Sequence, residues 1–252
     1  MSTNPSAALA GKTVLITGGA RRVGATLVRA LHAAGASVAL HYRSSGEAAT
    51  ALARELNTVR PESALTLEAD LLDLAQLQSL PAATVSAFGA LDVLINNAST
   101  FYPTPMDDIT EIDWNDLIGT NLKAPLFLSQ AAAGPLRISS GLILNIADIH
   151  GMRPLRRHPV YSIAKAGLIM LTRSLARELG PAIRVNAVAP GPVMWPEDGM
   201  DRELQRKIVD NTALKRAGSA EDVARAVLFF ATQAPYVTGQ VLAVDGGRSI
   251  SW

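Results

Sequence analysis

The sequence predicts one α/β domain over residues 1–252, built on a parallel, doubly wound sheet of seven strands flanked by helices. Three observations predict this fold. A length of 252 residues suits one large α/β domain, with two smaller domains as the alternative. Short apolar runs alternate with helical patterns throughout the chain. The runs are apolar at successive positions, which is typical of parallel strands buried on both faces.

The predicted strands share a short apolar run that ends in turn or polar residues. They are Lys12–Thr17, Ser37–His41, Ala64–Glu68, Leu91–Asn96, Leu142–Ile146, Ile183–Val188 and Gln240–Val244. Helical patterns follow most of them, and no helix is assigned between the third and fourth strands. The predicted helices are Val23–Ala34, about Gly46–Val59, one or more between Asp107 and Ile138, one that ends near Leu179, and Ala220–Ala231. This alternation is typical of a single-domain Rossmann-type fold.

Two segments stand outside the alternating pattern. Residues 1–10 are predicted to form a flexible N-terminus. Residues 190–212 follow the carboxyl end of the sixth strand and begin with a stretch that has no clear pattern, Pro190–Gly199. Ligands of open α/β sheets bind at that edge, so residues 190–212 are predicted to form a lid over the substrate.

Composition excludes several classes of function. The net charge is +1, from 23 basic and 22 acidic residues, which gives no support to a nucleic-acid or membrane-surface role. The absence of cysteine excludes disulfides and thiolate chemistry, and the four histidines lack metal-ligand spacing, so no metal site is predicted. No secretory signal or membrane span is recognisable, and we expect a cytoplasmic protein.

A glycine-rich loop, Thr17–Gly24 (TGGARRVG), lies between the first strand and the first helix. Backbone N–H groups and the positive end of a helix meet there, which suits the pyrophosphate of a dinucleotide. The alternative is a structural glycine turn. The second strand then ends in His41-Tyr42-Arg43-Ser44-Ser45, with no acid to bind a free ribose 2′-OH. Arg43 and the two serines suit a 2′-phosphate, which favours NADPH over NADH; a basic surface loop is the alternative.

The stretch Asp148–Lys165 (DIHGMRPLRRHPVYSIAK) carries the most specific chemistry. Tyr161 and Lys165 are four residues apart and lie on one face of a helix. An ammonium there is expected to lower the pKa of the phenol, so that Tyr161 exchanges protons near neutral pH. Asp148 is unusual, because a carboxylate repels a developing alkoxide. The residues therefore predict a reductase whose substrate is not a simple ketone.

The chain resembles the short-chain dehydrogenase/reductase family over essentially its whole length. The motifs that carry the resemblance are specific as a set: Thr17–Gly24, Asn96-Asn97-Ala98, Asn121, Tyr161-x-x-x-Lys165 and Pro190-Gly191. Two departures from the usual pattern resemble the pteridine reductases within this family, because Arg22 replaces the middle glycine and Asp148 replaces the catalytic serine. The segments LHYRSSGEA and NNASTFYPTP are also similar to that subfamily.

This resemblance implies a catalytic set of Asp148, Tyr161, Lys165 and Asn121. Tyr161 would be the proximate acid, Lys165 would tune it and hold the nicotinamide ribose, Asp148 would orient Tyr161, and Asn121 would hold a water near Lys165. Cofactor contacts are expected from Gly18, Arg21, Arg22, Val23, His41, Tyr42, Arg43, Ser44, Ser45, Asp70, Leu71, Asn97, Ala98, Ser99, Lys165, Pro190 and Gly191.

For the substrate, the resemblance implies contacts from Arg22, Ser99, Phe101, Asp148, Tyr161 and Trp195. Phe101 would stack on a pterin, and the alternative is a core aromatic. Trp195 would pack over the substrate or only anchor the lid. Arg153, Arg156 and Arg157 form a basic loop, for which a solvated surface is the simpler interpretation and attraction of an anionic substrate, such as a folate glutamate tail, is the alternative.

The resulting hypothesis is an NADPH-dependent pteridine reductase that acts on a dihydropterin, an oxidised pterin or dihydrofolate. The enzymatic alternative is a carbonyl reductase of the same fold, acting on a 3-oxoacyl thioester or a sugar. The non-enzymatic alternative is an NADP(H)-binding redox sensor. The family resemblance also implies a homotetramer built through the long helices and the C-terminal segment, of which residues 248–252 are a candidate for reaching a neighbouring subunit's site.

Overall fold

The computed structural model describes residues 8–195 and 199–250. Its centre is a seven-stranded sheet in the order β3-β2-β1-β4-β5-β6-β7, and every strand pair is parallel. The strands are β1 (Thr13–Ile16), β2 (Ser37–Tyr42), β3 (Ala64–Glu68), β4 (Val93–Asn96), β5 (Leu142–Ile146), β6 (Arg184–Pro190) and β7 (Val241–Val244). The predicted α/β fold with a seven-stranded parallel sheet is confirmed.

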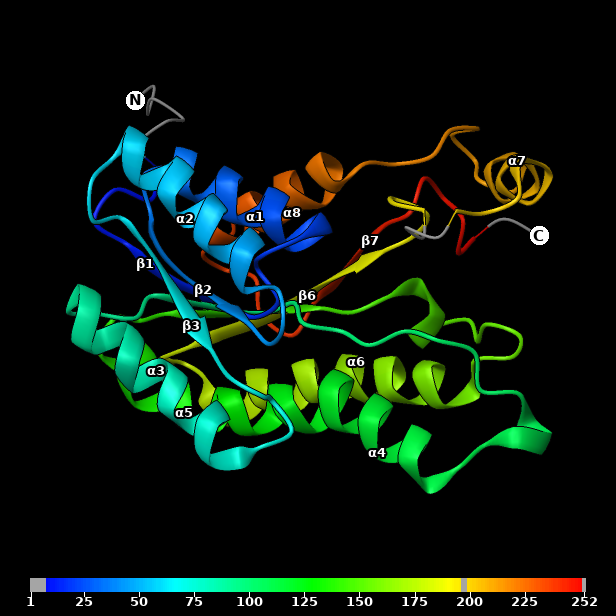
Figure 1. Ribbon diagram of the computed structural model, residues 1–252, viewed down its shortest axis with the longest axis horizontal. Helices are drawn as coiled ribbons and strands as arrows, with labels where there is room; N and C mark the ends of the chain where they lie inside the picture. Colours follow the sequence, from blue (N-terminus) through cyan, green and yellow to red (C-terminus); the bar gives the residue numbers. More distant parts are fainter. Residues whose placement is uncertain (1–7, 196–198, 251–252) are drawn as a thin grey trace.

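Helices cover both faces of the sheet (Figure 1). One face carries α1 (Arg22–Ala33), α2 (Gly46–Val59) and α8 (Ala220–Thr232), which pack apolar side chains into one core. The other face carries α3 (Leu74–Phe88), α4 (Glu111–Ile118), α5 (Ala124–Ile138) and α6 (Pro159–Leu179). Because both faces are covered, β1, β4 and β5 are buried along their whole length.

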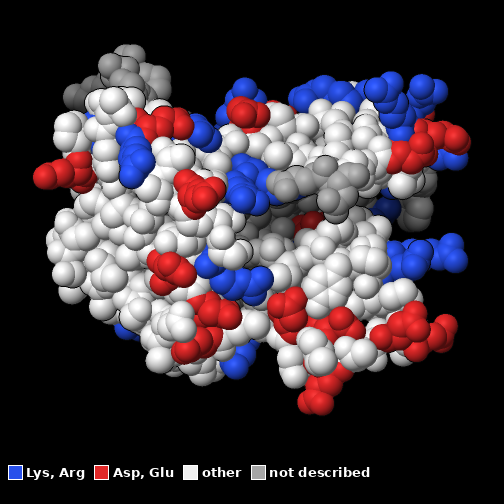
Figure 2. Space-filling view, viewed as in Figure 1, with Lys and Arg blue, Asp and Glu red and all other residues white. Residues whose placement is uncertain are grey.

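The order of the strands reverses between β1 and β4. From β1 the chain builds outward through β2 and β3, and from β4 it builds outward in the other direction through β5, β6 and β7. The loops that leave the carboxyl ends of β1 and β4 therefore diverge and open a crevice, which is where open α/β sheets bind ligands. Figure 2 shows the molecule hollowed right of centre, between the two layers of helices.

Helix α3 was missed by the sequence analysis. Its interior holds Pro81, a residue that lacks an N–H donor and usually interrupts a helix. Two features outweigh this cost. Asp73 caps the helix by accepting hydrogen bonds from the N–H groups of Ala75 and Gln76, and the face that carries Leu77 and Leu80 is buried against the sheet. Tertiary packing thus overrides the local propensity.

The segments outside the alternating pattern are more ordered than expected where the structure describes them. Leu9 is 3% exposed and its N–H donates to the carbonyl of Ala34, so the predicted flexible N-terminus does not extend to residue 10. Residues 1–7 lie outside the described residues. The predicted lid contains a helix that was not assigned, α7 (Arg202–Asp210), capped by Asp201. Residues 196–198 of the lid and residues 251–252 of the C-terminal segment also lie outside the described residues.

No helix in the described ranges is both long enough and apolar enough to cross a membrane.

Candidate active site

The glycine-rich loop is locked to the loop that follows β4. The hydroxyl of Thr17 accepts hydrogen bonds of 3.0 Å from the backbone N–H groups of both Asn97 and Ala98. In return, the side-chain amide of Asn97 donates to the carbonyls of Thr17 and Gly18 at 2.9 and 3.0 Å. Gly18 has a φ of +62°, and a Cβ there would lie 2.9 Å from the Cα of Ala98. The two loops predicted to hold the cofactor are therefore one hydrogen-bonded unit.

Gly24, at the end of the glycine-rich loop, has no space for a side chain. A Cβ would overlap the carbonyl oxygen of Gly18 and lie 2.8 Å from the amide nitrogen of Asn97. We expect Gly24→Ala to weaken NADPH binding by about tenfold or more, because α1 must move away from the loop to relieve the overlap. Fluorescence titration with NADPH measures this. Gly134→Ala is the matched control, since a Cβ at Gly134 meets no atom within 4 Å; equal affinities for the two variants would contradict the prediction.

Arg22 connects the glycine-rich loop to the lid. It begins α1 with a φ of +53°, a left-handed backbone conformation that is unusual for a residue with a side chain. Its guanidinium donates to the carbonyl oxygen of Trp195 at 3.1 Å. The structure thus brings together two of the predicted substrate contacts, Arg22 and half-buried Trp195, which are 173 residues apart in the sequence. On either side of Arg22 in this loop, Arg21 is exposed and Val23 is half-buried.

Two predicted cofactor contacts are occupied within the protein. His41 is 2% exposed; its Nδ1 accepts from the backbone N–H of Gly18 at 3.2 Å, and its Nε2 donates to the carbonyl of Ala69 at 3.0 Å. Burial lowers the pKa of His41, which favours the neutral ring that this pattern requires. Leu71 is 6% exposed and packs into the core. Both side chains therefore face the protein interior, and His41 supports the glycine-rich loop from behind.

The end of β2 remains accessible, as the cofactor prediction requires. Arg43 and Ser44 are exposed and Ser45 is half-buried at the start of α2. Tyr42 is half-buried, and its hydroxyl donates to the carboxylate of Glu68 at 3.0 Å.

Asp70, after β3, is half-buried and turns its carboxylate onto the N–H of Leu72 at 2.9 Å. At the other end of the crevice, Pro190 is the buried last residue of β6, followed by Gly191. A Cβ on Gly191 would lie 2.6 Å from the Cβ of Asp245. Close packing against the loop after β7 therefore fixes where the lid segment leaves the sheet.

Asp148 and Tyr161 form the centre of the site. The Tyr161 hydroxyl donates to Oδ2 of Asp148 at 2.9 Å, and Oδ1 of Asp148 accepts from the N–H of His150 at 2.7 Å. Asp148 lies just past β5 and Tyr161 in the first turns of α6, so the sheet and the helix set their separation. Asp148 is half-buried whereas Tyr161 is 4% exposed. The half-buried carboxylate keeps acceptor capacity beyond these two hydrogen bonds.

Lys165 lies one turn below Tyr161 on α6 and is buried. Its Nζ donates to the carbonyl of Ile146 at 3.0 Å and lies 5.7 Å from the centre of the Tyr161 ring. The expected lowering of the phenol's pKa is wrong for this structure. Burial and then the neighbouring Asp148 carboxylate raise the pKa of Tyr161 well above its usual value, against a smaller opposing hydrogen bond from Ser99. Tyr161 therefore holds its proton, as an acid must before donating it.

Burial also lowers the pKa of Lys165, to about 8, against the opposing attraction of Asp148. Lys165 therefore loses its positive charge as the pH rises through this value. We expect kcat/KM to fall as the pH is raised above about 8. A pH profile at subsaturating substrate and saturating NADPH measures this, with thermal stability followed over the same range as the control. If kcat/KM stayed constant up to pH 10, the charged form of Lys165 would not be required for activity, and the prediction would be wrong.

Asn121, predicted to hold a water near Lys165, has its side chain fully used in hydrogen bonds within the protein. It lies in a one-turn π-helix, Gly119–Lys123, and is fully buried. Its side-chain amide donates to the carbonyls of Thr100 and Leu117 at 3.0 and 2.9 Å, and its Oδ1 accepts from the Ser99 hydroxyl at 2.6 Å. Its side chain thus positions exposed Ser99 at the crevice. A π-helical turn inside a helix is frequently found at functional sites.

Phe101 is 52% exposed, so the core-aromatic alternative is wrong. Its ring stacks on His158, with centroids 4.7 Å apart and planes 10° apart, and lies nearly perpendicular to Tyr161 at 4.8 Å. The sequence analysis assigned no role to His158. The only sequence signal was its position three residues before Tyr161, and whether it meets Phe101 depends on the tertiary fold.

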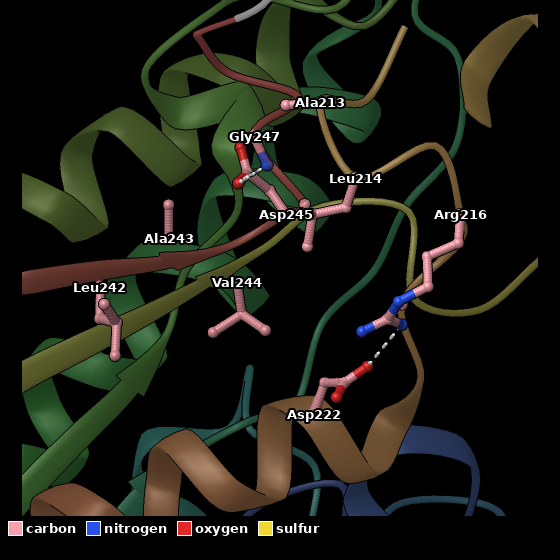
Figure 3. Close-up of a pocket in the computed structure, with 11 residues that line it drawn as sticks. Ala213, Leu214, Arg216, Asp222, Leu242, Ala243, Val244, Asp245 and Gly247 are labelled. Atoms are coloured by element: carbon pink, nitrogen blue, oxygen red, sulfur yellow. Dashed lines mark hydrogen bonds and ion pairs between the residues drawn. The ribbon is translucent and has the colours of Figure 1, made fainter. Parts of the chain in front are cut away.

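One cavity that the structure describes lies away from these residues. It holds about 480 Å³ between β7, the start of α8 and residues 213–218. Figure 3 shows Leu242, Val244 and Leu214 around it, with Arg216 paired to Asp222 at 3.4 Å. It contains none of the predicted catalytic side chains, so the chemistry does not belong there. Among the described residues no group of His, Asp or Glu side chains suits a metal ion.

The known proteins to which this chain is similar are reductases or dehydrogenases. A family model described as enoyl-(acyl carrier protein) reductase matches residues 18–249. The chain is 37% identical over 294 aligned residues to pteridine reductase 1 of Leishmania tarentolae, covering 100% of this chain and 99% of that protein. It is 35% identical over 240 residues to 3-oxoacyl-[acyl-carrier-protein] reductase FabG of Staphylococcus aureus, covering 94% and 97%. A solved short-chain dehydrogenase/reductase from Serratia marcescens superimposes with a TM-score of 0.91 at 35% identity, over 98% of this chain and 100% of that one.

Proposed function

The chain belongs to the short-chain dehydrogenase/reductase family and is an oxidoreductase, and from that membership and the geometry of the site we propose that it is an NADPH-dependent pteridine reductase. Its substrates would be dihydropterins, with oxidised pterins and dihydrofolate as further members of the class. The similarity to a pteridine reductase and to a 3-oxoacyl reductase is nearly equal, 37% against 35%, so the choice depends on the site itself.

One observation carries the proposal: the group that meets the Tyr161 hydroxyl is the carboxylate of Asp148, at 2.9 Å. An ionised carboxylate only accepts hydrogen bonds. It suits a substrate edge rich in N–H donors, such as the amino group and ring N–H of a pterin. It opposes a ketone, whose oxygen gains negative charge as it is reduced. Exposed Phe101, beside Tyr161, adds an aromatic face for a flat heterocycle.

The residues at the crevice suit NADPH. Gly18 and Gly24 leave no room for a Cβ, so the glycine-rich loop packs closely on the loop after β4 and on the start of α1. Its backbone N–H groups at the start of this helix would hold the pyrophosphate. The end of β2 offers exposed Arg43 and Ser44 to a 2′-phosphate. Lys165 would hold the nicotinamide ribose. When bound, NADPH supplies the hydride, and the protein supplies orientation and the proton.

Arg43 is predicted to set the preference for NADPH. We expect Arg43→Ala to weaken NADPH binding by about tenfold, because a charge-assisted contact with the 2′-phosphate is lost, and to leave NADH binding unchanged. Titration with both cofactors measures this. Arg54→Ala, also exposed but in the middle of α2, changes the net charge equally and serves as the control. An equal loss for NADPH and NADH would contradict a 2′-phosphate contact.

In this proposal the chain's own residues handle the proton. Tyr161 keeps its proton because burial and Asp148 raise its pKa, and it would deliver the proton to the ring nitrogen next to the carbon that is reduced. Asp148 would orient the Tyr161 hydroxyl, accept hydrogen bonds from the pterin and help to pass a proton in from water. Asn121 would act through Ser99, which it holds at 2.6 Å.

The second candidate is a carbonyl reductase acting on a 3-oxoacyl thioester, favoured by the similarity to the Staphylococcus aureus reductase. It requires Asp148 to be protonated so that it can donate a hydrogen bond to the substrate oxygen. Isothermal titration of the enzyme loaded with NADP⁺ tests the choice. Dihydrobiopterin should bind, and Asp148→Ser should weaken that binding while it leaves acetoacetyl thioester binding unchanged or tighter. Binding of the thioester alone to the unmodified protein would favour the second candidate.

A further inference from the structure

We propose that a basic cavity beside Asp148 binds the carboxylate of an anionic tail on the substrate, such as the glutamyl group of a conjugated pterin. The inference rests on the proposed function and deepens it, because it selects pterins that carry an aminobenzoyl-glutamate tail. It concerns a second binding region that shares no catalytic side chain with the first.

The cavity holds about 400 Å³ and has two kinds of wall. Ile149, Pro154 and Leu155 form an apolar wall, whereas His150, Arg153 and Arg248 supply basic groups. Ser249 completes the lining, and no acidic residue belongs to the part that the structure describes. An apolar wall with cationic groups suits a ligand with a flat apolar body and a terminal carboxylate.

The cavity is fixed relative to the catalytic residues. Ile149 follows Asp148 directly, and the N–H of His150 donates to the Asp148 carboxylate at 2.7 Å. The next residue, Gly151, packs so closely on α6 that a Cβ would lie 2.7 Å from the backbone carbonyl of Lys165. The cavity wall therefore begins at the residue that follows Asp148, and in this proposal the tail of a substrate ring held at Asp148 extends into the cavity.

The two arginines come from different elements and converge on the cavity. Arg153 lies in the loop after β5, and half-buried Arg248 lies in the loop after β7. Arg248 donates to the carbonyl of Asn211 at 3.4 Å, which holds it on the protein. Asp245, in the same loop as Arg248, turns its carboxylate onto the N–H groups of Gly247 and Ser249. Guanidinium groups are suited to carboxylates because their planar fork donates two parallel hydrogen bonds.

The structure distinguishes the three arginines of the basic loop that was predicted from the sequence. Arg153, Arg156 and Arg157 are all exposed, and of the three it is Arg153 that lines the cavity. Arg156→Gln is therefore the matched control, because it removes the same charge from the same loop. General attraction of an anion predicts equal effects at Arg153 and Arg156, whereas a cavity site predicts an effect at Arg153 alone.

The first experiment compares two pterins, dihydrofolate with its glutamyl tail and dihydrobiopterin without one. In the Arg153→Gln/Arg248→Gln variant, the KM for dihydrofolate should rise about tenfold, and that for dihydrobiopterin should change less than about twofold. Added salt should raise the KM for dihydrofolate in the unmodified enzyme and have little effect in the variant. An unchanged KM for dihydrofolate, or an equal rise for Arg156→Gln, overturns the proposal.

The second experiment needs no turnover and separates this inference from the proposed function. Calorimetry measures binding of p-aminobenzoyl-L-glutamate and of 4′-phosphopantetheine to the full chain loaded with NADP⁺. Arginine-dependent binding of p-aminobenzoyl-L-glutamate supports the carboxylate site even if no pterin is reduced. Binding of 4′-phosphopantetheine alone, or of neither compound, overturns it. Reduction of dihydrobiopterin without binding of p-aminobenzoyl-L-glutamate would leave the proposed function standing and remove this inference.

Discussion

Tyr161→Phe is expected to lower kcat for dihydropterin reduction by about 10³-fold. The hydroxyl that is lost donates to Asp148 at 2.9 Å and carries the proton in the proposed mechanism. Burial and Asp148 raise its pKa, so in the unmodified protein it is protonated throughout the working range of pH. Phenylalanine keeps the ring and its packing, including the perpendicular contact with Phe101. The loss should therefore appear in kcat, with little change in NADPH affinity or in thermal stability.

Tyr102→Phe is the matched control for this prediction. Tyr102 packs against the same small cluster as Tyr161 and also has a raised pKa, about 12, caused first by burial and then by a hydrogen bond to Asp116. Tyr102→Phe also removes one tyrosine hydroxyl near the site, but it leaves the hydrogen bond between Tyr161 and Asp148 intact. Steady-state and single-turnover rates of both variants decide the matter: a Tyr161→Phe enzyme as active as Tyr102→Phe would remove Tyr161 from the mechanism.

Asp148→Ser has the second large effect, and its sign depends on the substrate. We expect kcat/KM for dihydrobiopterin to fall about 10²-fold, because the serine hydroxyl cannot replace a charged acceptor for the donors of the pterin. The same change removes one cause of the raised pKa of Tyr161 and leaves a neutral donor beside it. Reduction of an acetoacetyl thioester should therefore be unchanged or faster.

Asp148→Asn separates charge from shape at this position. The amide keeps an acceptor oxygen but loses the negative charge. The kcat/KM of this variant for dihydrobiopterin should therefore also be well below that of the unmodified enzyme. Rates measured with both substrates on both variants give the comparison. If both variants reduced the thioester more slowly and the pterin at an unchanged rate, Asp148 would belong to carbonyl reduction, which contradicts the account.

The sequence predicts this fold well where local patterns and tertiary packing agree. All seven strands and the helix that carries Tyr161 and Lys165 are found close to their predicted bounds, because buried parallel strands and a helix with a defined end leave clear patterns. Helix α3 was missed because Pro81 argues against a helix locally, whereas its burial against the sheet decides the outcome. Helix α7 was missed because it buries no residue and so lacks the apolar signal of a core helix.

The structure brings Asp148, Tyr161 and Lys165 together, as their pattern in the sequence predicted, but the electrostatics of this group could not be predicted. The four-residue spacing of Tyr161 and Lys165 indicates a shared helix face, yet the pKa of Tyr161 is raised rather than lowered. Its direction depends on burial and on a carboxylate brought from the end of β5, neither of which spacing reveals. The same holds for His41, whose ring is turned inward onto Gly18 and Ala69 although its position at the end of a strand indicated a cofactor contact.

The most direct test is NADPH oxidation, followed at 340 nm, with dihydrobiopterin, dihydrofolate and an acetoacetyl thioester side by side and NADH as the cofactor control. The account predicts turnover of the pterins with NADPH, much slower turnover with NADH, and little or none of the thioester. Turnover of the thioester alone would contradict the role given to Asp148. Cofactor binding without turnover of any of the three would contradict pterin reduction and favour a protein that only senses NADP(H).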